Sequence, residues 1–496
     1  MYKRLSQEKQ FKQIYIFSLI FIYFFANVAA IPFLPAEQVT QWSQPRTIPL
    51  YQLGILPPVL VADQNRTVHA FSSQLIDLDN GATLRVIFYN QWSLARGWTL
   101  PTDIIISPYK EARITDVHLG SSGIFHLIFF GGDETGADIY YSQVSAPLAD
   151  DSRVWSTPIV IGKNASDPAN AAIVESDQGT LSVVYSGREQ GNGLYVVNSK
   201  DNGATWSDAA PIYLAQSNTP NLSLLSVIKG ESGWLHAVWG VFNVAGQGRG
   251  IYYTRSKDGI EWSEPNLLVS AEEGLGTQTP AIIEYDGVVF VFYSGISMLQ
   301  SFDNGVTWNN PVKIFPRFTG VNGTLSPVID GNNVLHLFFG QRISGNPDIH
   351  GMWHSTFENN RWTEPMAVTK GPRVVDKQGL TGFDPYDAHA VVSQGNVLLV
   401  TWRTDPGDIR DNGIWYSYST VDAPELPLAT FPPMIAKNDT TSTPTEISAP
   451  SISTKDTGQI SFEKDRQVRN PLGWIAIVVI FVSIIMVIYM LSKRNS

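Results

Sequence analysis

The sequence predicts an all-β chain folded as a β-propeller of four-stranded antiparallel blades. A Trp-x-x-Pro signature, counting one near-match at Trp206, recurs at spacings of 46 to 57 residues. Between signatures lie three short segments in which apolar and polar residues alternate with the period of two that is typical of strands. A strand-rich unit repeated at this period indicates a propeller. The tryptophans are Trp42, Trp98, Trp155, Trp206, Trp262, Trp308 and Trp362.

The units can be followed in order along the chain. In unit one the third strand is expected at Leu84–Asn90, and the segment after each signature tryptophan is expected to add the fourth strand. The clearest sets of three strands are Ala171–Glu175, Leu181–Ser186 and Leu194–Asn198 in unit three; Leu224–Ile228, Leu235–Trp239 and Ile251–Arg255 in unit four; and Ser326–Ile329, Val334–Phe339 and Met352–Ser355 in unit six.

The last unit explains how the ring closes. Its strands at Ala390–Ser393, Val397–Trp402 and Ile414–Tyr418 are followed by Pro-rich sequence and not by a fourth strand. Conversely, Trp42 has no three strands before it. The segment Arg46–Leu53 is therefore expected to close the last blade, which removes both sheet edges and gives seven blades.

Both ends of the chain point to a membrane. Residues 1–30 combine a basic start, an apolar run and small residues at Val28 and Ala30, as a cleaved signal peptide does; an uncleaved anchor is the alternative. Residues 31–431 form the predicted propeller, and 432–470 a Ser/Thr/Pro-rich disordered stalk. Residues 471–496 hold twenty uncharged residues, Leu472 to Leu491, and a short basic tail, which predicts a transmembrane helix. The expected location is the cell membrane, single-pass, with the propeller outside.

Composition narrows the function classes. The chain has no cysteine among its 496 residues, so disulfides, thiolate metal sites and cysteine nucleophiles are excluded. Residues 31–431 carry 23 Lys and Arg against 39 Asp and Glu, a net charge of −16, which disfavours nucleic acid as a partner. The acidic run Asp405–Asp411 lacks the spacing of an EF-hand, and no metal or cofactor is expected.

A sharper motif precedes several fourth strands. In it an Asp caps turn amides, a Gly takes a positive φ, and a Trp packs between strands. Two full copies and one shortened copy resemble the Asp-box, or BNR, repeat of the sialidase-like propellers, a superfamily whose true sialidases have six blades. These structural residues are Ser199, Asp201, Gly203 and Trp206; Ser256, Asp258 and Trp262; and Ser301, Asp303, Gly305 and Trp308.

The face opposite the Asp-boxes is the default binding site. Arg188, Arg342 and Arg403 follow the second strands of three units at equivalent places, which suits a clamp for a ligand carboxylate. The resemblance implies, for a sialidase, three such arginines, an Asp acid/base and a Tyr nucleophile activated by Glu. Tyr386 and Asp387 are the catalytic candidates nearby. The Arg-Ile-Pro motif of the family is missing, since Arg46-Thr-Ile-Pro49 is only loosely similar and falls in the closing strand.

Three functions remain open from the sequence. The first is a monomeric, membrane-anchored propeller that binds glycan or another surface ligand without turnover. The second is an active exo-sialidase-type glycoside hydrolase, and the third is an adhesion scaffold for protein partners. Exposed charges at loop tips could also serve solubility alone. The Asn-x-Ser/Thr sequons that would accept glycans in a suitable host begin at Asn65, Asn164, Asn221, Asn322 and Asn438.

Overall fold

The computed structural model describes the chain between Trp42 and Leu428. The undescribed stretches within that range are 52–56, 79–80, 108, 110, 134–135, 167–169, 216–220, 244–246, 271–279, 343–345, 372–373, 376–380 and 405–412. The chain divides into two compact units, Met1–Pro432 and Pro433–Ser496, and all described residues belong to the first. The predicted signal peptide, stalk and transmembrane helix lie outside the described residues. No helix with the length and hydropathy of a membrane span occurs within the described part.

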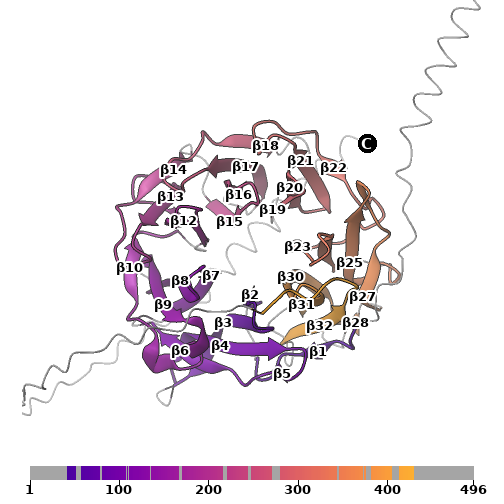
Figure 1. The fold of residues 1–496 in the computed structure, drawn as a ribbon, viewed down its shortest axis with the longest axis horizontal. Helices are drawn as coiled ribbons and strands as arrows, with labels where there is room; N and C mark the ends of the chain where they lie inside the picture. The colour runs from indigo at the N-terminus through magenta and orange to yellow at the C-terminus, as the bar shows by residue number, and fades with distance from the viewer. Residues whose placement is uncertain are drawn as a thin grey trace, which may run out of the picture. The chain divides into compact units, whose positions relative to one another are not determined.

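Seven antiparallel sheets surround a common centre, as Figure 1 shows, and this confirms the predicted all-β propeller with seven blades. Blade one contains β2 (Val59–Ala62), β3 (Val68–Asp77), β4 (Thr83–Ser93) and β6 (Thr102–Ile106), with β5 (Gly97–Trp98) beside β4. Blade two contains β7 (Glu111–Leu119), β8 (Ile124–Asp133), β9 (Gly136–Ser145) and β10 (Ile159–Gly162), with the 3₁₀ turns η1 (Ala146–Leu148) and η2 (Ser152–Val154). Blade three contains β11 (Ala171–Glu175), β12 (Leu181–Gly187), β13 (Gly193–Ser199) and β14 (Ala210–Leu214).

The second half of the ring repeats the same order. Blade four contains β15 (Asn221–Lys229), β16 (Leu235–Phe242), β17 (Gly248–Ser256) and β18 (Asn266–Ser270). Blade five contains β19 (Ala281–Tyr285), β20 (Val288–Tyr293), β21 (Ser297–Ser301) and β22 (Val312–Lys313). Blade six contains β23 (Ser326–Ile329), β24 (Leu335–Gln341), β25 (Gly351–Glu358) and β27 (Met366–Lys370), with β26 (Arg361–Trp362) beside β25 and the separate pair β28 (Val374–Val375) and β29 (Thr381–Phe383) after it.

Blade seven closes the ring. It contains β30 (Pro385–Ser393), β31 (Val397–Thr404) and β32 (Ile414–Thr420), and its fourth strand is β1 (Arg46–Thr47) from the start of the described chain. Arg46 lies opposite Tyr416 in this pair. The predicted closure within Arg46–Leu53 is therefore confirmed. Because the first and last segments share one sheet, opening the ring requires separating strands nearly 370 residues apart in sequence.

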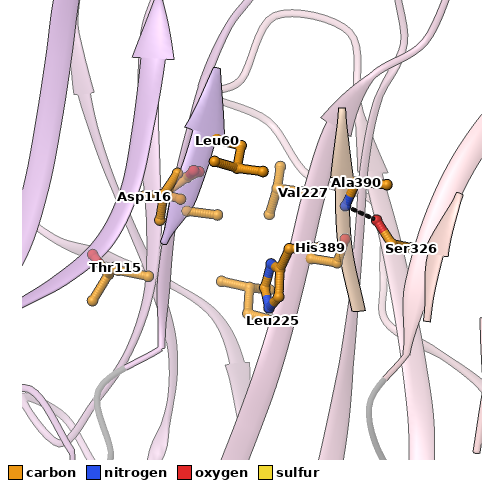
Figure 2. A pocket seen from close by; sticks show the side chains of 12 residues that line it. Leu60, Thr115, Asp116, Leu225, Val227, Ser326, His389 and Ala390 are labelled. Carbon is orange, nitrogen blue, oxygen red and sulfur yellow. Dashed lines mark hydrogen bonds between the residues drawn. The ribbon is translucent and has the colours of Figure 1, made fainter. Parts of the chain in front are cut away.

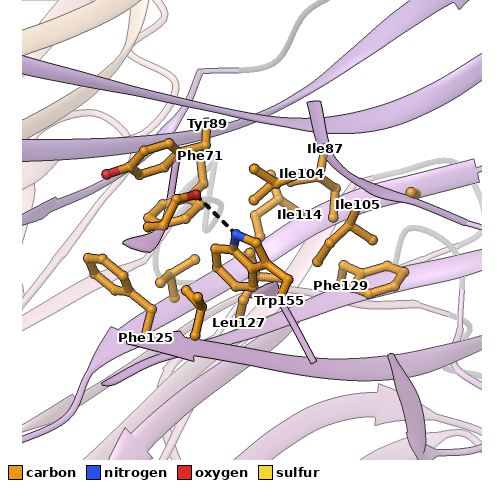
Figure 3. Packing of buried hydrophobic residues seen from close by; sticks show 14 of the residues in the cluster. Phe71, Ile87, Tyr89, Ile104, Ile105, Ile114, Phe125, Leu127, Phe129 and Trp155 are labelled. Atoms are coloured by element: carbon orange, nitrogen blue, oxygen red, sulfur yellow. Dashed lines mark hydrogen bonds between the residues drawn. The ribbon is translucent and has the colours of Figure 1, made fainter. Parts of the chain in front are cut away.

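Large apolar side chains fill the space between neighbouring blades. Between blades one and two, Phe71 and Phe125 meet edge to face at 5.3 Å between ring centroids, and Trp155 lies beside them (Figure 3). The Trp155 indole N–H donates to the Ala149 carbonyl at 3.0 Å. Burying each such aromatic side chain contributes about 1.5–3 kcal/mol, so the signature tryptophan stabilises the contact between blades.

The two ends of the strands define two faces. We call the side that holds the turns between first and second and between third and fourth strands the turn face, and the opposite side the loop face. The Asp-box turns lie on the turn face. Asp201 accepts hydrogen bonds from the Thr205 N–H at 2.8 Å and from the Ser199 hydroxyl at 2.8 Å, while Gly203 has a φ of 86°. Asp303 makes the same bonds to Thr307 and Ser301, at the same distances.

The Asp-box turns also contact the preceding blade. Trp206 packs edge to face on Tyr141 of β9 at 5.0 Å, and Trp308 on Tyr253 of β17 at 4.9 Å. In the shortened copy, Asp258 accepts from the Ile260 and Glu261 amides, and the Trp262 indole donates to the Gly259 carbonyl. These turns therefore join neighbouring blades as well as neighbouring strands.

The described chain begins and ends on the turn face. After β32, residues Val421–Leu428 cross the turns of blades six and seven. The Val421 N–H donates to the Asn396 carbonyl at 2.9 Å, and the Leu426 N–H donates to the Gln394 carbonyl at 2.7 Å. Glu425 then reaches Arg66 of blade one at 2.6 Å. We call Val421–Leu428 the C-terminal strap, since it ties together the three blades where the ring closes.

Candidate functional site

Two arginines from adjacent blades meet over one tyrosine on the loop face. Tyr386 is the second residue of β30 and is 9% exposed. The guanidinium carbon of Arg342, just after β24, lies 4.7 Å from the centroid of its ring, and that of Arg403, in β31, lies 4.4 Å from it. Each cation–π contact of this kind contributes about 0.5–2 kcal/mol. The structure therefore brings together four of the five candidates from the sequence, since Asp387 follows Tyr386 directly.

Asp387 sits in a β-bulge between Tyr386 and His389, with a φ of 57°. Its Oδ2 accepts from the Arg403 Nε at 2.8 Å, and its Oδ1 accepts from the Thr324 N–H at 3.0 Å and the Thr324 hydroxyl at 3.2 Å. The bulge turns the carboxylate toward blade six, because an extra residue re-aims the side chains of a strand. Asp387 thus fixes the Arg403 guanidinium next to the ring.

The segment that leads into blade six supports this arrangement. Asn322 is 2% exposed; its amide nitrogen donates to the Gly340 carbonyl at 2.9 Å, and its oxygen accepts from the Gly295 N–H at 3.0 Å. Gly323 follows with a φ of 67°, and a Cβ there would lie 2.3 Å from Asp387 Oδ1. Only glycine allows this backbone to approach Asp387 and Tyr386 so closely.

A buried pair holds the start of β30. His350 Nε2 lies 2.9 Å from Asp384 Oδ1, and His350 Nδ1 lies 2.8 Å from the Gly371 carbonyl. Both side chains are almost completely shielded from solvent. Since Asp384 lies two residues before Tyr386, this pair connects the loops of blade six to the strand that carries the site.

Arg188 lies elsewhere on the loop face. It follows β12 in blade three, is exposed, and donates its N–H to the Asn164 carbonyl at 2.9 Å. Blades four and five separate it from blade six, and blades one and two separate it from blade seven. It is therefore not in the Tyr386 cluster. Of the other charged loop residues, Arg317 pairs with Glu364, while Glu134, Arg373, Asp376 and the run 405–411 lie outside the described residues.

The central channel contains a second group of polar side chains. A cavity of about 270 Å³ is lined by the first strands of six blades, and Figure 2 shows Asp116, His389 and Ser326 on its wall. Asp116 accepts from the Val117 and Ile173 amides at 2.8 and 3.0 Å, and burial raises its pKa to about 7. Burial lowers the pKa of His389 to about 4. Asp116 is not among the candidates from the sequence, where a single carboxylate within a strand has no distinguishing pattern.

Within the described ranges, His, Asp and Glu side chains form no group of three that could hold a metal ion. The sequon at Asn322 is not a surface site, because its amide is enclosed and hydrogen-bonded and its Thr324 serves Asp387. Asn65 and Asn164 are exposed.

No protein-family model matches the chain, and no curated protein matches it. Among solved structures, an ulvan lyase of polysaccharide lyase family PL25 is 11% identical, with a TM-score of 0.49 over 77% of this chain and 97% of its own. The leech intramolecular trans-sialidase is 11% identical, with a TM-score of 0.41 over 76% and 70%. The NanB sialidase of Streptococcus pneumoniae is 12% identical, with a TM-score of 0.38 over 78% and 71%. Sialidases are thus among the propellers that this fold resembles, at a level that says nothing about ligand.

Proposed function

We propose that this propeller binds an acidic glycan, one that carries a sugar carboxylate, on its loop face at the Tyr386 cluster. The observation that carries the proposal is the meeting of Arg342 and Arg403, from two blades, over one aromatic ring. A guanidinium suits a carboxylate because it offers paired donors in one plane. The Tyr386 ring lies under both guanidiniums and is 9% exposed, so it holds the two arginines side by side.

Among the described residues of the cluster, the charge favours an anionic ligand although the propeller as a whole is acidic. Arg342 and Arg403 contribute two positive charges, and Asp387 contributes one negative charge that is already bonded to Arg403 and Thr324. Side chains in the cluster are partly exposed, with 27% of the Arg403 side chain accessible. A partly shielded site raises the strength of a charge-assisted bond above its value in bulk water.

Binding without turnover fits the described residues better than hydrolysis. A sialidase of the type implied by the resemblance needs a Tyr hydroxyl activated by a Glu. Among the described residues, no Glu shares a hydrogen bond with the Tyr386 hydroxyl, and Asp387 is held by three hydrogen bonds. We therefore keep Tyr386 as the ring that positions the two arginines, with sialidase action as the alternative.

We further propose that the protein is anchored to the cell membrane by a C-terminal helix, with the propeller outside. The support is the run of twenty uncharged residues from Leu472 to Leu491. A propeller tethered through the predicted stalk would be accessible to ligands outside the cell.

The deciding experiment compares the full chain with sialyllactose and neutral lactose in titration calorimetry. We expect binding of the charged sugar alone. Arg403→Ala removes a charge-assisted contact of about 1.5–3 kcal/mol, a loss of roughly 10- to 100-fold in affinity. Arg153→Ala is the matched control, because Arg153 is exposed on the turn face. Equal affinity for lactose, or no effect of Arg403→Ala, would refute the proposal.

A fluorogenic aryl sialoside separates binding from catalysis. If the chain is an exo-sialidase, wild type releases the fluorophore and Tyr386→Phe does not. If it binds without turnover, both are silent while sialyllactose still binds. Failure to bind either sugar, together with capture of a protein ligand, would favour the adhesion scaffold.

A further inference from the structure

The turn between β2 and β3 exposes an asparagine in a fixed backbone. Asp63 Oδ1 accepts hydrogen bonds from the Asn65 and Thr67 N–H groups, both at 2.8 Å, and Arg66 between them has a φ of 67°. The Asn65 side chain enters none of the hydrogen bonds among the described residues and is open to solvent. Asn65-Arg66-Thr67 is an Asn-x-Thr acceptor sequence, so its amide is presented as a glycosyl acceptor requires.

A cavity adjoins this asparagine on the turn face. Its volume is about 520 Å³, within the range of small-molecule sites. Hydrogen-bonding groups and apolar carbon share its wall, which includes Gln91, Leu94, Arg96 and Gln394. The turn Ser93–Trp98 takes the place of an Asp-box in blade one but lacks the Asp. Amide, guanidinium and aliphatic groups together suit a sugar, which offers hydroxyls on its rim and C–H groups on its faces.

The other described sequons provide the contrast. Asn322 is 2% exposed with both amide atoms bonded, and a glycan on it would prevent blades five, six and seven from packing. Asn164 is exposed on the loop face beside Arg188. A glycan is therefore compatible with the fold at Asn65 and Asn164 but not at Asn322.

We propose that Asn65 carries an N-linked glycan whose first sugar lies in the adjoining cavity. The donor is a lipid-linked saccharide diphosphate. A bond forms between Asn65 Nδ2 and the sugar C1 while the bond from C1 to the phosphate oxygen breaks. The amide loses one proton to a base of the transferase, and the lipid diphosphate leaves. The step requires export, which the N-terminal segment predicts, and does not depend on ligand binding at Tyr386.

The test uses the full chain isolated from its own cells and, in parallel, from a eukaryotic secretory host. Enzymatic deglycosylation in ¹⁸O-water converts each glycosylated asparagine to labelled aspartate, which peptide mass spectrometry locates. We expect label at Asn65 and none at Asn322. Thr67→Ser retains the acceptor sequence and should keep the label, whereas Thr67→Ala keeps the backbone bond to Asp63 and should lose it. An unlabelled Asn65 in both preparations, or label at Asn322 in folded protein, would overturn the proposal.

The position of the first sugar has its own readout. If the sugar occupies the cavity, deglycosylation of the folded protein at Asn65 is slow, and Arg96→Ala or Gln394→Ala accelerates it several-fold. Arg153→Ala, a change at an exposed arginine outside the cavity, should leave the rate unchanged. Equal rates in all four proteins would show that the glycan does not use the cavity.

Discussion

The Nε of Arg403 lies 2.8 Å from Oδ2 of Asp387, and the two residues come from neighbouring strands of blade seven. This bond orients a guanidinium that also lies over the Tyr386 ring. Because Asp387 is anchored at its other oxygen by Thr324 of blade six, the pair joins two blades at the point where ligand is proposed to bind. Any change at Asp387 should therefore affect both the ring of blades and the site.

Asp387→Asn separates the charge of this carboxylate from its shape. Asparagine tolerates the positive φ and can still accept from Thr324, but it removes the negative charge that holds Arg403. We expect a fall of about 1–2 kcal/mol in the free energy of unfolding, measured in urea, and weaker sialyllactose binding by calorimetry. Asp387→Ala should cost more, since it also leaves the Thr324 amide without its acceptor. Equal stability of the two variants would contradict this account.

Glycine is required at position 305 both by the positive φ of the backbone and by the lack of space for a Cβ, and the two costs can be measured separately. Gly305 has a φ of 83°, and a Cβ there would lie 1.8 Å from the Tyr253 hydroxyl. Gly97 has a φ of 71° with nothing within 4 Å, so Gly97→Ala measures the backbone strain alone, about 1 kcal/mol. We expect Gly305→Ala to lower the free energy of unfolding clearly more than Gly97→Ala.

Tyr253→Phe tests the clash directly. Removing the hydroxyl leaves His236 Nδ1, which lies 2.7 Å from it, without that partner, so the single variant is itself destabilised. In the double variant with Gly305→Ala the steric cost should be relieved only in part, because two ring carbons of residue 253 still lie 2.4 and 2.6 Å from the added Cβ, so a small favourable coupling energy is expected in the urea titrations. Strict additivity would mean that the turn moves aside instead.

Acid should destabilise the propeller through histidines that stay neutral in the folded state. Burial lowers the pKa of His126 and His236 to about 4 each and that of His354 well below its usual value. Between about pH 6.5 and 4 the unfolded chain therefore binds more protons than the folded one, and the free energy of unfolding falls as pH falls. Each such histidine lowers the free energy of unfolding by at most about 1.4 kcal/mol for each pH unit of acidification.

The effect of Asp116 on stability as pH falls is opposite to that of the histidines. Burial raises its pKa to about 7, so between about pH 4 and 7 the folded state binds the extra proton and stability rises as pH falls. We expect urea unfolding of Asp116→Asn to lose stability more steeply than wild type from about pH 7 to 5. An equal or shallower slope in the variant would show that the channel leaves Asp116 ionised at neutral pH.

The blade count and the ring closure could be predicted because both depend on local patterns. Period-two alternation and the spaced tryptophans locate strands, and a missing fourth strand at one end matches the unpaired Arg46–Leu53 at the other. Trp155 and Trp206 occupy the same place in their units because each fills a gap between blades.

The site was only partly predictable, because it depends on which blades are neighbours and on local irregularity. Arg188, Arg342 and Arg403 have the same position within their units, so the sequence could not tell that only the latter two meet. The bulge at Asp387 meets Thr324 at the entry to blade six, and Asn322 is enclosed by Gly295 of blade five and Gly340 of blade six; no local pattern records these contacts between blades. Asp116 was missed since a channel carboxylate reads as an ordinary interruption of a strand.

Whether Arg188 contributes to binding should depend on the length of the glycan. It shares the loop face with the Tyr386 cluster but belongs to blade three, with two blades between it and the cluster on either side. A sugar the size of one residue bound at Arg403 cannot reach it, whereas an extended acidic glycan crossing the channel mouth can. We expect Arg188→Ala to leave the affinity for sialic acid unchanged and to weaken binding of an oligosialic acid by several-fold, measured by calorimetry.

Because an exposed charge contributes less than a shielded one, the loss of affinity for oligosialic acid should be smaller in Arg188→Ala than in Arg403→Ala. An equal loss for the single sugar would place Arg188 in the clamp itself, and no loss for either ligand would confine binding to blades six and seven.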